Sequence, residues 1–421
     1  MREASFCVLL AAVLLETSIN SSCSKTKSES ACCPKTNIFV ANMFKTIGAG
    51  KIREVREERS AMENIIGGRN FSVKKSNISS IEEFGHFEQY FKKVSIIDFS
   101  KEVLLGKLIS VDVNQDGMLL VVDALAANVY LFDTSGNLVK KLSPENCLSG
   151  MPWRPIMAKF MAKDKIFVLT SSPQVGVIFS REGGCASISI EKNAFTFNVN
   201  IDAEDNIYSF YAREKKSYIT KTDVHGKRLL TFGDFRRPFE KLSAHHAGGG
   251  LVCGNGAIYQ ALLTGPEVYV FNSNGDLIDT LKRSPSFFKP IESDLVAENT
   301  TQSIVFETKK LMKGKTFVHS LFLLEEDKLL MQYMHDRSKT IIDIFDLNGK
   351  PLVDRGILTD NYIIALAKSR KAYVITQPGW DQNKELPNPR LEVYEFTGNP
   401  KVSGVRIIPH CGVSIIPHFF Q

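Results

Sequence analysis

The chain has 421 residues, of which 43% are hydrophobic and 23% charged, so it can bury a sizeable core and is neither a disordered nor a fibrous protein. The formal net charge is +6, but residues 24–80 hold 11 Lys/Arg against five Glu, which leaves 40 basic and 39 acidic residues after position 80. This nearly neutral body argues against a nucleic-acid-binding protein, because such a protein presents a concentrated cationic surface.

The first residues have the organisation of a secretory signal. Met1-Arg2 precede an uninterrupted apolar run, Phe6–Leu15, and small polar residues follow it at Ser21-Ser22. Ten helical residues rise only about 15 Å, roughly half the thickness of the bilayer hydrocarbon, so this run is too short to span a membrane. No later stretch approaches the roughly 20 apolar residues that a spanning helix needs. We expect residues 1–22 to be a signal peptide and the protein to be exported.

Cys23 follows this signal directly, at the position of the lipidated cysteine of a bacterial lipoprotein. Asn20 departs from that pattern, because Leu, Val or Ile is usual there. We expect a periplasmic or outer-membrane lipoprotein held to the membrane through Cys23, with a freely secreted product as the alternative. Residues 23–80 then form a basic arm or linker, which either favours anionic lipid head groups or is only solvated.

Six cysteines remain after the signal and Cys23, and the sequence assigns no disulfide among them. Six thiols allow 15 connectivities, and a core of this size does not need bridges. Small buried thiols are the simpler interpretation. The residues concerned are Cys32, Cys33, Cys147, Cys185, Cys253 and Cys411.

A strand of alternating apolar residues that ends in an Asp/Asn-rich turn with Gly recurs along the chain. Val129–Gly136 and Val268–Gly275 are nearly the same string, and four looser copies complete the series. Alternation buries every second side chain, and Asp, Asn and Gly tolerate the positive φ of a tight hairpin. The turn glycines are Gly136, Gly183, Gly226, Gly275, Gly349 and Gly398.

Another pair of short strands precedes most copies, for example Ile109–Val113 and Met118–Asp123. Each period then supplies four strands, which is one blade of a β-propeller. The pattern predicts an all-β, six-bladed propeller of four-stranded antiparallel blades over residues 81–400. The period is too long for a parallel β-helix and shows no helical spacing between strands, while a pair of β-sandwiches stays open as an alternative.

Two features concern the ends and the connections of this ring. Lys93–Phe99 could close it by pairing as an outer strand with the last blade, although Val402–Ile408, in the C-terminal tail 401–421, could fill the same place. An insertion, about 284–315, is expected either at one mouth of the ring or as a hairpin packed on its blade.

Val94–Gly106 together with the first unit resembles the opening of bacterial six-bladed β-propeller lipoproteins related to NHL-repeat proteins. The resemblance covers about residues 85–398 and depends on hydrophobic patterns and turns. It implies an envelope protein with a ring used for binding.

No catalytic signature accompanies the fold. Amidating lyases of the NHL type resemble the chain in fold and use histidines around a metal, but metal-site spacing is absent here, although His319 is placed where it could face the channel. Calcium-binding gluconolactonase-like propellers use Glu, Asn and Asp, yet Asp123, Asp202 and Asp343 occur where turns and strand ends favour Asp. We predict no metal site and no cofactor.

Four residues are candidates for ligand binding. Trp153 and Trp380 lie in Pro-bearing loops, where an exposed aromatic ring can stack on a sugar or a peptide or can instead pack as a lid. His245 and His246 precede a Gly-rich segment near the start of a unit. Gly248–Gly250 itself is expected to allow close packing at a blade junction or to form a mobile loop.

The leading hypothesis is therefore a binding or scaffolding module of the cell envelope. Its partner would be a peptide, a glycan or another envelope protein, with a lipid anchor to the membrane and no nucleic acid. The alternative is a propeller hydrolase or lyase with a divalent metal in the channel, which depends on analogy of fold alone.

Overall fold

The structure is a computed structural model that describes residues 84–398, with gaps at 100–101, 145–146, 149, 172–173, 182, 191–194, 214–215, 237–248, 291–313, 336–338, 354, 368 and 377–388. All described residues belong to one of two compact units, Ser76–Gln421. Within them, no helix has the length and apolarity needed to cross a bilayer. The predicted boundaries at 22, 80 and 400 fall outside the described residues and stay predictions.

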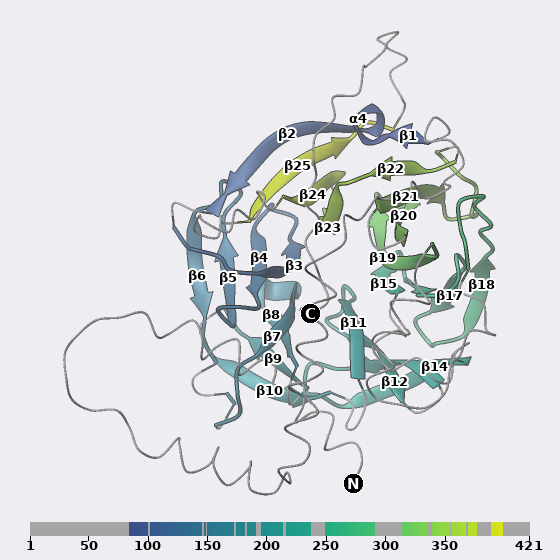
Figure 1. Ribbon diagram of the computed structural model, residues 1–421. Helices are drawn as coiled ribbons and strands as arrows, with labels where there is room; N and C mark the ends of the chain where they lie inside the picture. Colours follow the sequence, from purple (N-terminus) through teal and green to yellow (C-terminus); the bar gives the residue numbers. More distant parts are fainter. Residues whose placement is uncertain are drawn as a thin grey trace, which may run out of the picture. The chain divides into compact units, whose positions relative to one another are not determined.

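Six antiparallel sheets follow one another around a ring, which confirms the predicted six-bladed propeller (Figure 1). Blades 1 to 3 comprise β3 (Leu108–Val113), β4 (Leu119–Asp123), β5 (Asn128–Phe132), β6 (Leu138–Leu142); β7 (Pro155–Phe160), β8 (Ile166–Thr170), β9 (Val175–Phe179), β10 (Cys185–Ser189); and β11 (Phe195–Ile201), β12 (Ile207–Arg213), β13 (Lys216–Thr222), β14 (Arg228–Arg236).

Blade 4 uses consecutive strands, and blades 5 and 6 each add a strand from the start of the described chain. These three blades comprise β15 (Gly249–Gly254), β16 (Ala257–Leu262), β17 (Val268–Asn272), β18 (Leu277–Leu281); β19 (Thr316–Leu324), β20 (Lys328–His335), β21 (Lys339–Asp346), β22 (Ile357–Thr359) with β1 (Gly85–His86); and β23 (Tyr362–Leu366), β24 (Lys371–Thr376), β25 (Arg390–Phe396) with β2 (Phe91–Asp98).

The turn that contains the marker glycine follows the third strand of every blade. In blades 1 to 5 it joins the third strand to the fourth, whereas the fourth strand of blade 6 is β2, from the start of the described chain. All six marker glycines have positive φ, from 79° to 96°. In blade 1 the Asp133 carboxylate accepts hydrogen bonds from the backbone N–H groups of Ser135 and Asn137 at 2.8 and 2.9 Å. Asp recurs in this turn because its carboxylate accepts the backbone N–H groups that shape the hairpin. Gly recurs because it adopts the left-handed backbone conformation that the hairpin requires.

The inner strand of each blade faces the ring axis, and this gives the ring two distinct ends. The inner strands are β3, β7, β11, β15, β19 and β23 (Figure 1). Because each blade has four antiparallel strands, the chain enters and leaves a blade at the same end, which also bears the hairpins between second and third strands. We name this the connection end, and the opposite end, with the other hairpins, the turn end.

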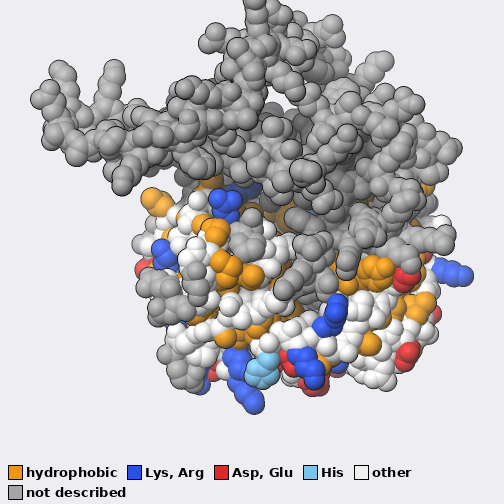
Figure 2. All heavy atoms as spheres, turned by 90° about the horizontal axis from the view of Figure 1, so that it is seen from below, with side chains coloured by type: hydrophobic (Ala, Val, Ile, Leu, Met, Phe, Trp, Pro, Cys, Tyr) orange, Lys and Arg blue, Asp and Glu red, His pale blue; other side chains and the backbone are white. Residues whose placement is uncertain are grey.

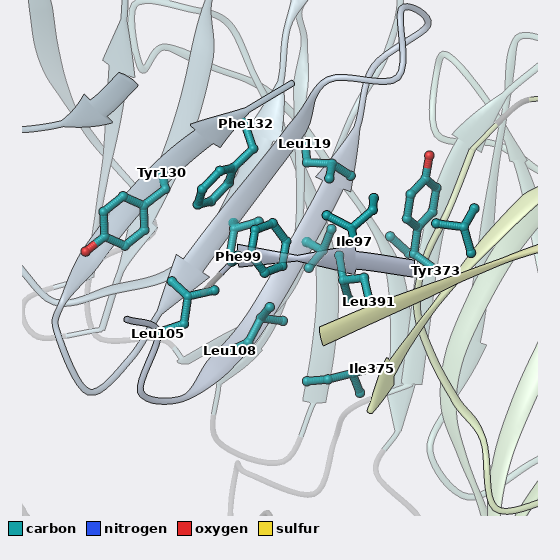
Figure 3. Close-up of a cluster of buried hydrophobic side chains, with 14 of the residues drawn as sticks. Ile97, Phe99, Leu105, Leu108, Leu119, Tyr130, Phe132, Tyr373, Ile375 and Leu391 are labelled. Atoms are coloured by element: carbon teal, nitrogen blue, oxygen red, sulfur yellow. The ribbon is translucent and has the colours of Figure 1, made fainter. Parts of the chain in front are cut away.

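The ring is closed by β2, as the sequence predicts for Lys93–Phe99. β2 pairs antiparallel with β25, from Phe91 opposite Phe396 to Asp98 opposite Arg390. Its competitor, Val402–Ile408, lies outside the described residues. Side chains of β2 and the following turn enter the core between blades 6 and 1, where Ile97 and Phe99 contact a cluster that includes Phe132 and Leu391 (Figure 3).

A second closure, not expected from the sequence, lies just before β2. β1 adds a fifth, parallel strand to blade 5, and a one-turn helix, α4 (Phe87–Tyr90), leads from it to blade 6. Phe87 and Phe91 stack with ring centroids 4.4 Å apart inside the core between these blades. Residues 85–98 therefore tie blade 5 to blade 6 as well as closing the ring.

The blade faces are apolar and the rim is mixed. Six buried clusters fill the spaces between neighbouring blades. On the side seen in Figure 2, hydrophobic side chains lie in small groups among charged and other polar ones. Leu229, Leu277 and Ile278, on the outer strands β14 and β18, are 47%, 55% and 58% exposed. Scattered exposure of this kind is ordinary for a globular surface.

A disulfide joins Cys147 to Cys185, with Cα atoms 5.8 Å apart. It attaches the connection between blades 1 and 2 to the outer strand β10. From the sequence no disulfide was assigned, and small buried thiols were the simpler interpretation. Cys253, on β15, is a free thiol, and burial raises its pKa, which disfavours the reactive thiolate.

Candidate ligand-binding site at the ring axis

Four inner strands carry a β-bulge at the same position. The bulged residues are Ile109, Ile156, Phe197 and His319, each of which shifts the pairing with the second strand by one residue. A bulge re-aims the neighbouring side chains and disturbs the simple alternation of a strand. Ile109, Ile156 and His319 all keep part of their surface exposed.

The residue that follows the bulge defines one level of the axis in every blade. Each of these residues pairs with a residue of the second strand of its blade. That second-strand residue pairs in turn with the third-strand residue seven positions before the marker glycine. We name this set the collar, and it consists of Ser110, Met157, Asn198, Gly250, Ser320 and Tyr362. It lies near the connection end in blades 4 and 6, where Gly250 is the second residue of β15 and Tyr362 the first of β23, and at the middle of the longer strands β11 and β19.

The most polar part of the collar lies where blades 5 and 6 meet. His319 Nδ1 lies 2.9 Å from Ser320 Oγ and 2.9 Å from the hydroxyl oxygen of Tyr362. The imidazole and phenol rings meet edge to face, with centroids 5.0 Å apart. Blades 1 and 2 have isoleucine where blade 5 has His319, so the histidine is a local replacement of an apolar wall by a hydrogen-bonding group.

Burial keeps this cluster uncharged. It lowers the pKa of His319 to about 4 and raises the pKa of Tyr362 to about 12. At neutral pH the imidazole is therefore neutral and the phenol protonated. A neutral imidazole has one donor and one acceptor nitrogen, so the cluster presents mixed donors and acceptors without net charge.

Gly250 lets two inner strands approach closely beside this cluster. A Cβ added to Gly250 would lie 2.2 Å from Leu321 Cβ and 2.3 Å from the Leu321 backbone nitrogen. The glycine therefore allows close packing at a blade junction, which was one of the two roles predicted for the Gly-rich segment.

Only two residues of the six inner strands are charged, Asp112 and Lys159. They lie two residues beyond the collar, toward the turn end, and form an ion pair with 2.9 Å between Lys159 Nζ and Asp112 Oδ1. Asp112 also accepts the backbone N–H of Phe160 at 2.9 Å. The pair joins blade 1 to blade 2 and leaves the collar itself free of charged residues.

Of the four ligand-binding candidates from the sequence, Trp153 is described. Its partly buried ring meets that of Phe179 edge to face at 6.1 Å, and it belongs to the core between blades 1 and 2. Trp380, His245 and His246 lie outside the described residues, as does Cys23. The described strand ends that flank them, Arg236 and Gly249 for the histidines and Thr376 and Arg390 for Trp380, are at the connection end.

The three acidic candidates are held in separate structural contacts. Asp123 accepts four backbone N–H groups, from Gly106, Lys107, Leu125 and Ala126, at 2.8 to 3.3 Å. Asp202 accepts N–H groups within its own turn.

Asp343 is nearly inaccessible and forms a buried ion pair with Arg283, 2.7 Å from Arg283 Nη2 to Asp343 Oδ2. The other described histidines are also dispersed. His225 lies in an exposed turn, His86 on β1, and His335 against Thr316. Among the described residues no three His, Cys, Asp or Glu side chains come together as metal ligands.

Sequence reasoning placed His319 near the start of a unit but missed Ser320 and Tyr362 as its neighbours. Their association requires the register between inner and second strands, which a bulge shifts by one residue in five blades, at Ile364 in β23 and at the common position in the other four. The marker glycine does offer a signal for finding the collar. The residue seven positions before it pairs with the second-strand residue that also pairs with the collar residue.

No protein-family model and no curated protein matches the sequence. Among solved structures, a Bacteroides fragilis protein described as exported is similar with a TM-score of 0.51 and 11% identity, over 76% of this chain and 97% of that chain. A DUF4221 family member from Bacteroides vulgatus gives 0.50 and 9%, over 74% and 99%. A streptogramin B lyase gives 0.44 and 9%, over 74% and 100%.

These identities establish similarity of fold alone. The chain has the architecture of bacterial six-bladed propeller proteins, as the resemblance of its sequence predicted. Lipidation at Cys23 stays a prediction.

Proposed function

We propose that this protein is a binding module of the cell envelope that takes its ligand at the connection end of the ring axis. The observation that carries the proposal is the collar together with His319, where partly exposed residues with hydroxyl, amide and imidazole groups come from several blades to one level of the axis. Convergent polar groups in an otherwise apolar setting are typical of small-ligand sites.

Placement of the other candidates supports the same end of the ring. The chain segments that contain Trp380 and His245-His246 leave and rejoin the described strands at the connection end, whereas the ring of Trp153 packs in the core between blades 1 and 2. So does the segment from Leu281 to Thr316, which includes the predicted insertion. Connections presented by a rigid scaffold are where binding residues concentrate.

A binding function is favoured over the metal-dependent lyase because the three acidic candidates are already engaged. Asp123, Asp202 and Asp343 stabilise turns or an ion pair in three different blades, and His319 is surrounded by hydroxyl groups. This arrangement is suited to recognition through hydrogen bonds.

Immobilised protein probed with glycan arrays, peptide arrays and detergent extracts of envelope membranes tests the proposal. We expect reproducible binding in at least one format and a loss of binding in a Ser320→Leu/Tyr362→Leu variant. Blank arrays together with no specific retention from the extracts would contradict the proposal.

We also propose that Cys23 carries a lipid that holds the ring at the membrane. The apolar run before it and the disulfide Cys147–Cys185 support export, since disulfides persist in oxidising compartments. Metabolic labelling with a palmitate analogue should label the wild type and spare a Cys23→Ala variant. Equal labelling of both proteins, or of neither, would overturn the anchoring.

A further inference from the structure

We infer that the collar recognises a neutral carbohydrate, an inference that depends on the proposed binding function and names its ligand class. The collar and the bulged residues before it contain no Asp, Glu, Lys or Arg. They combine hydrogen-bonding groups (Ser110, Asn198, His319, Ser320, Tyr362) with apolar side chains (Ile109, Ile156, Met157).

Charge excludes ionic ligands from this level of the axis. An anionic ligand would need an Arg or Lys partner to offset its desolvation, and a cationic ligand would need a carboxylate. Asp112 and Lys159, the two charged residues of the inner strands, neutralise each other beyond the collar. A bound charged group would therefore lie in this ring without a counter-charge.

The polar groups exclude a purely apolar ligand in the same way. Such a ligand would cover Ser320, Tyr362 and His319, whose hydrogen bonds to one another at 2.9 Å leave part of their donor and acceptor capacity unused. Leaving a buried polar group unpaired is unfavourable, and sites built to bind a hydroxyl discriminate strongly against analogues that lack it.

A pyranose ring has the complementary distribution of groups. Its hydroxyls are donors and acceptors at the edge, matching the mixed donors and acceptors of His319, Ser320 and Tyr362. Its C–H faces are apolar, and they match the partly exposed Ile156 and Met157, which pack between blades 2 and 3, across the ring from the junction of blades 5 and 6.

Calorimetry with the full-length protein tests the inference with four probes: maltohexaose, cellohexaose, an N-acetylglucosamine hexamer and, as the acidic comparator, a heparin hexasaccharide. The variants are Tyr362→Phe, which removes one hydroxyl, and His319→Ile, which installs the residue that blades 1 and 2 have there. Tyr130→Phe is the matched control, because the Tyr130 hydroxyl contacts Asn128 in blade 1 and lies outside the collar.

We expect at least one neutral oligosaccharide to bind, with affinity at least tenfold weaker in both collar variants and within twofold of wild type in Tyr130→Phe. Preferential binding of the heparin hexasaccharide, neutral binding that both collar variants retain, or no binding of any probe would overturn the inference. A peptide or a membrane protein retained under these last outcomes would leave the proposed binding function standing, whereas blank arrays and extracts would remove both.

Discussion

His319 links the collar to the pH dependence of stability. Burial lowers its pKa to about 4, whereas an unfolded histidine titrates near 6.5. Between these values the unfolded chain takes up a proton that the folded chain refuses, so this group makes stability fall as the pH is lowered from 6.5 towards 4. Above that window the histidine is neutral in both states and costs nothing.

The expected size of this effect is about 2 kcal/mol of unfolding free energy between pH 7 and pH 5 at most, since the side chain keeps some exposed surface. His319→Ile should remove it, so urea unfolding of the variant should lose correspondingly less stability over that interval. His225→Ala controls for the loss of a histidine in an exposed turn. The same pH dependence in His319→Ile and wild type would contradict the assignment.

Gly250 gives a prediction about backbone approach. Gly250→Ala places a methyl group within 2.7 Å of three Leu321 atoms, two of them backbone, so β15 and β19 must separate. We expect a loss of about 2–3 kcal/mol in denaturant unfolding, typical of overpacking. The control is Gly184→Ala, whose methyl would meet only Ser180 Oγ at 3.4 Å. Equal stability of the two variants would show that the junction is not tight.

At the level of single residues, the sequence predicted those whose role is local. The marker glycines and the turn aspartates follow from hairpin geometry, and all six glycines have the expected positive φ. Tyr362 and Ser320 could not be predicted as partners of His319, because a β-bulge shifts the register and the two residues come from different blades. The pairing of Cys147 with Cys185 could not be predicted either, because it depends on how closely the connection between blades 1 and 2 approaches the outer strand β10.

Among the connecting elements, the disulfide secures the segment between blades 1 and 2. It closes a loop with a sequence separation of 38 residues, for which the chain-entropy model gives about 4 kcal/mol. Cys147→Ser/Cys185→Ser should therefore lower the free energy of unfolding by about 2–4 kcal/mol. Reductant should lower the wild type to the level of the variant and leave the variant unchanged. A wild type indifferent to reductant would contradict a stabilising role.

The outer strand β2 is the element on which closure depends. A chain that begins at residue 100 lacks β2 and the buried side chains of Phe91, Ile97 and Phe99, which exposes the edge of β25. We expect no cooperative unfolding transition for this protein. A chain that ends at residue 398 keeps β2 and should unfold within about 1 kcal/mol of wild type, by circular dichroism during urea denaturation. Loss of folding in the second truncation only would assign closure to the tail.

Elements were predictable where periodicity identifies them and less so where the chain crosses between blades. β2 was expected from its alternation and its position before the first unit. β1 was not, since two residues carry no periodic signal and gain a place in blade 5 only through parallel pairing with β22. The described start of the predicted insertion packs on its blade, with Phe287 buried against Tyr333 at 5.2 Å between ring centroids.

For the whole molecule, the repeat alone determined the architecture. A four-stranded sheet with two apolar faces must be covered on both sides, and six copies can satisfy this only by closing into a ring. Function did not follow in the same way, because a propeller accepts many ligands and its collar residues vary between blades. The ring sets where a ligand can lie, and the side chains at the axis determine which ligand it is.

Hydrogen exchange with and without the best-bound array ligand tests the central claim, that binding occurs at the connection end of the axis. We predict slower exchange in peptides that cover the starts of β19 and β23, from Thr316 to Leu321 and from Tyr362 to Leu366. The turn-end hairpins, such as Asn114–Gly117, should exchange at unchanged rates. Protection confined to those hairpins or to the outer strands β14 and β18 would contradict the account.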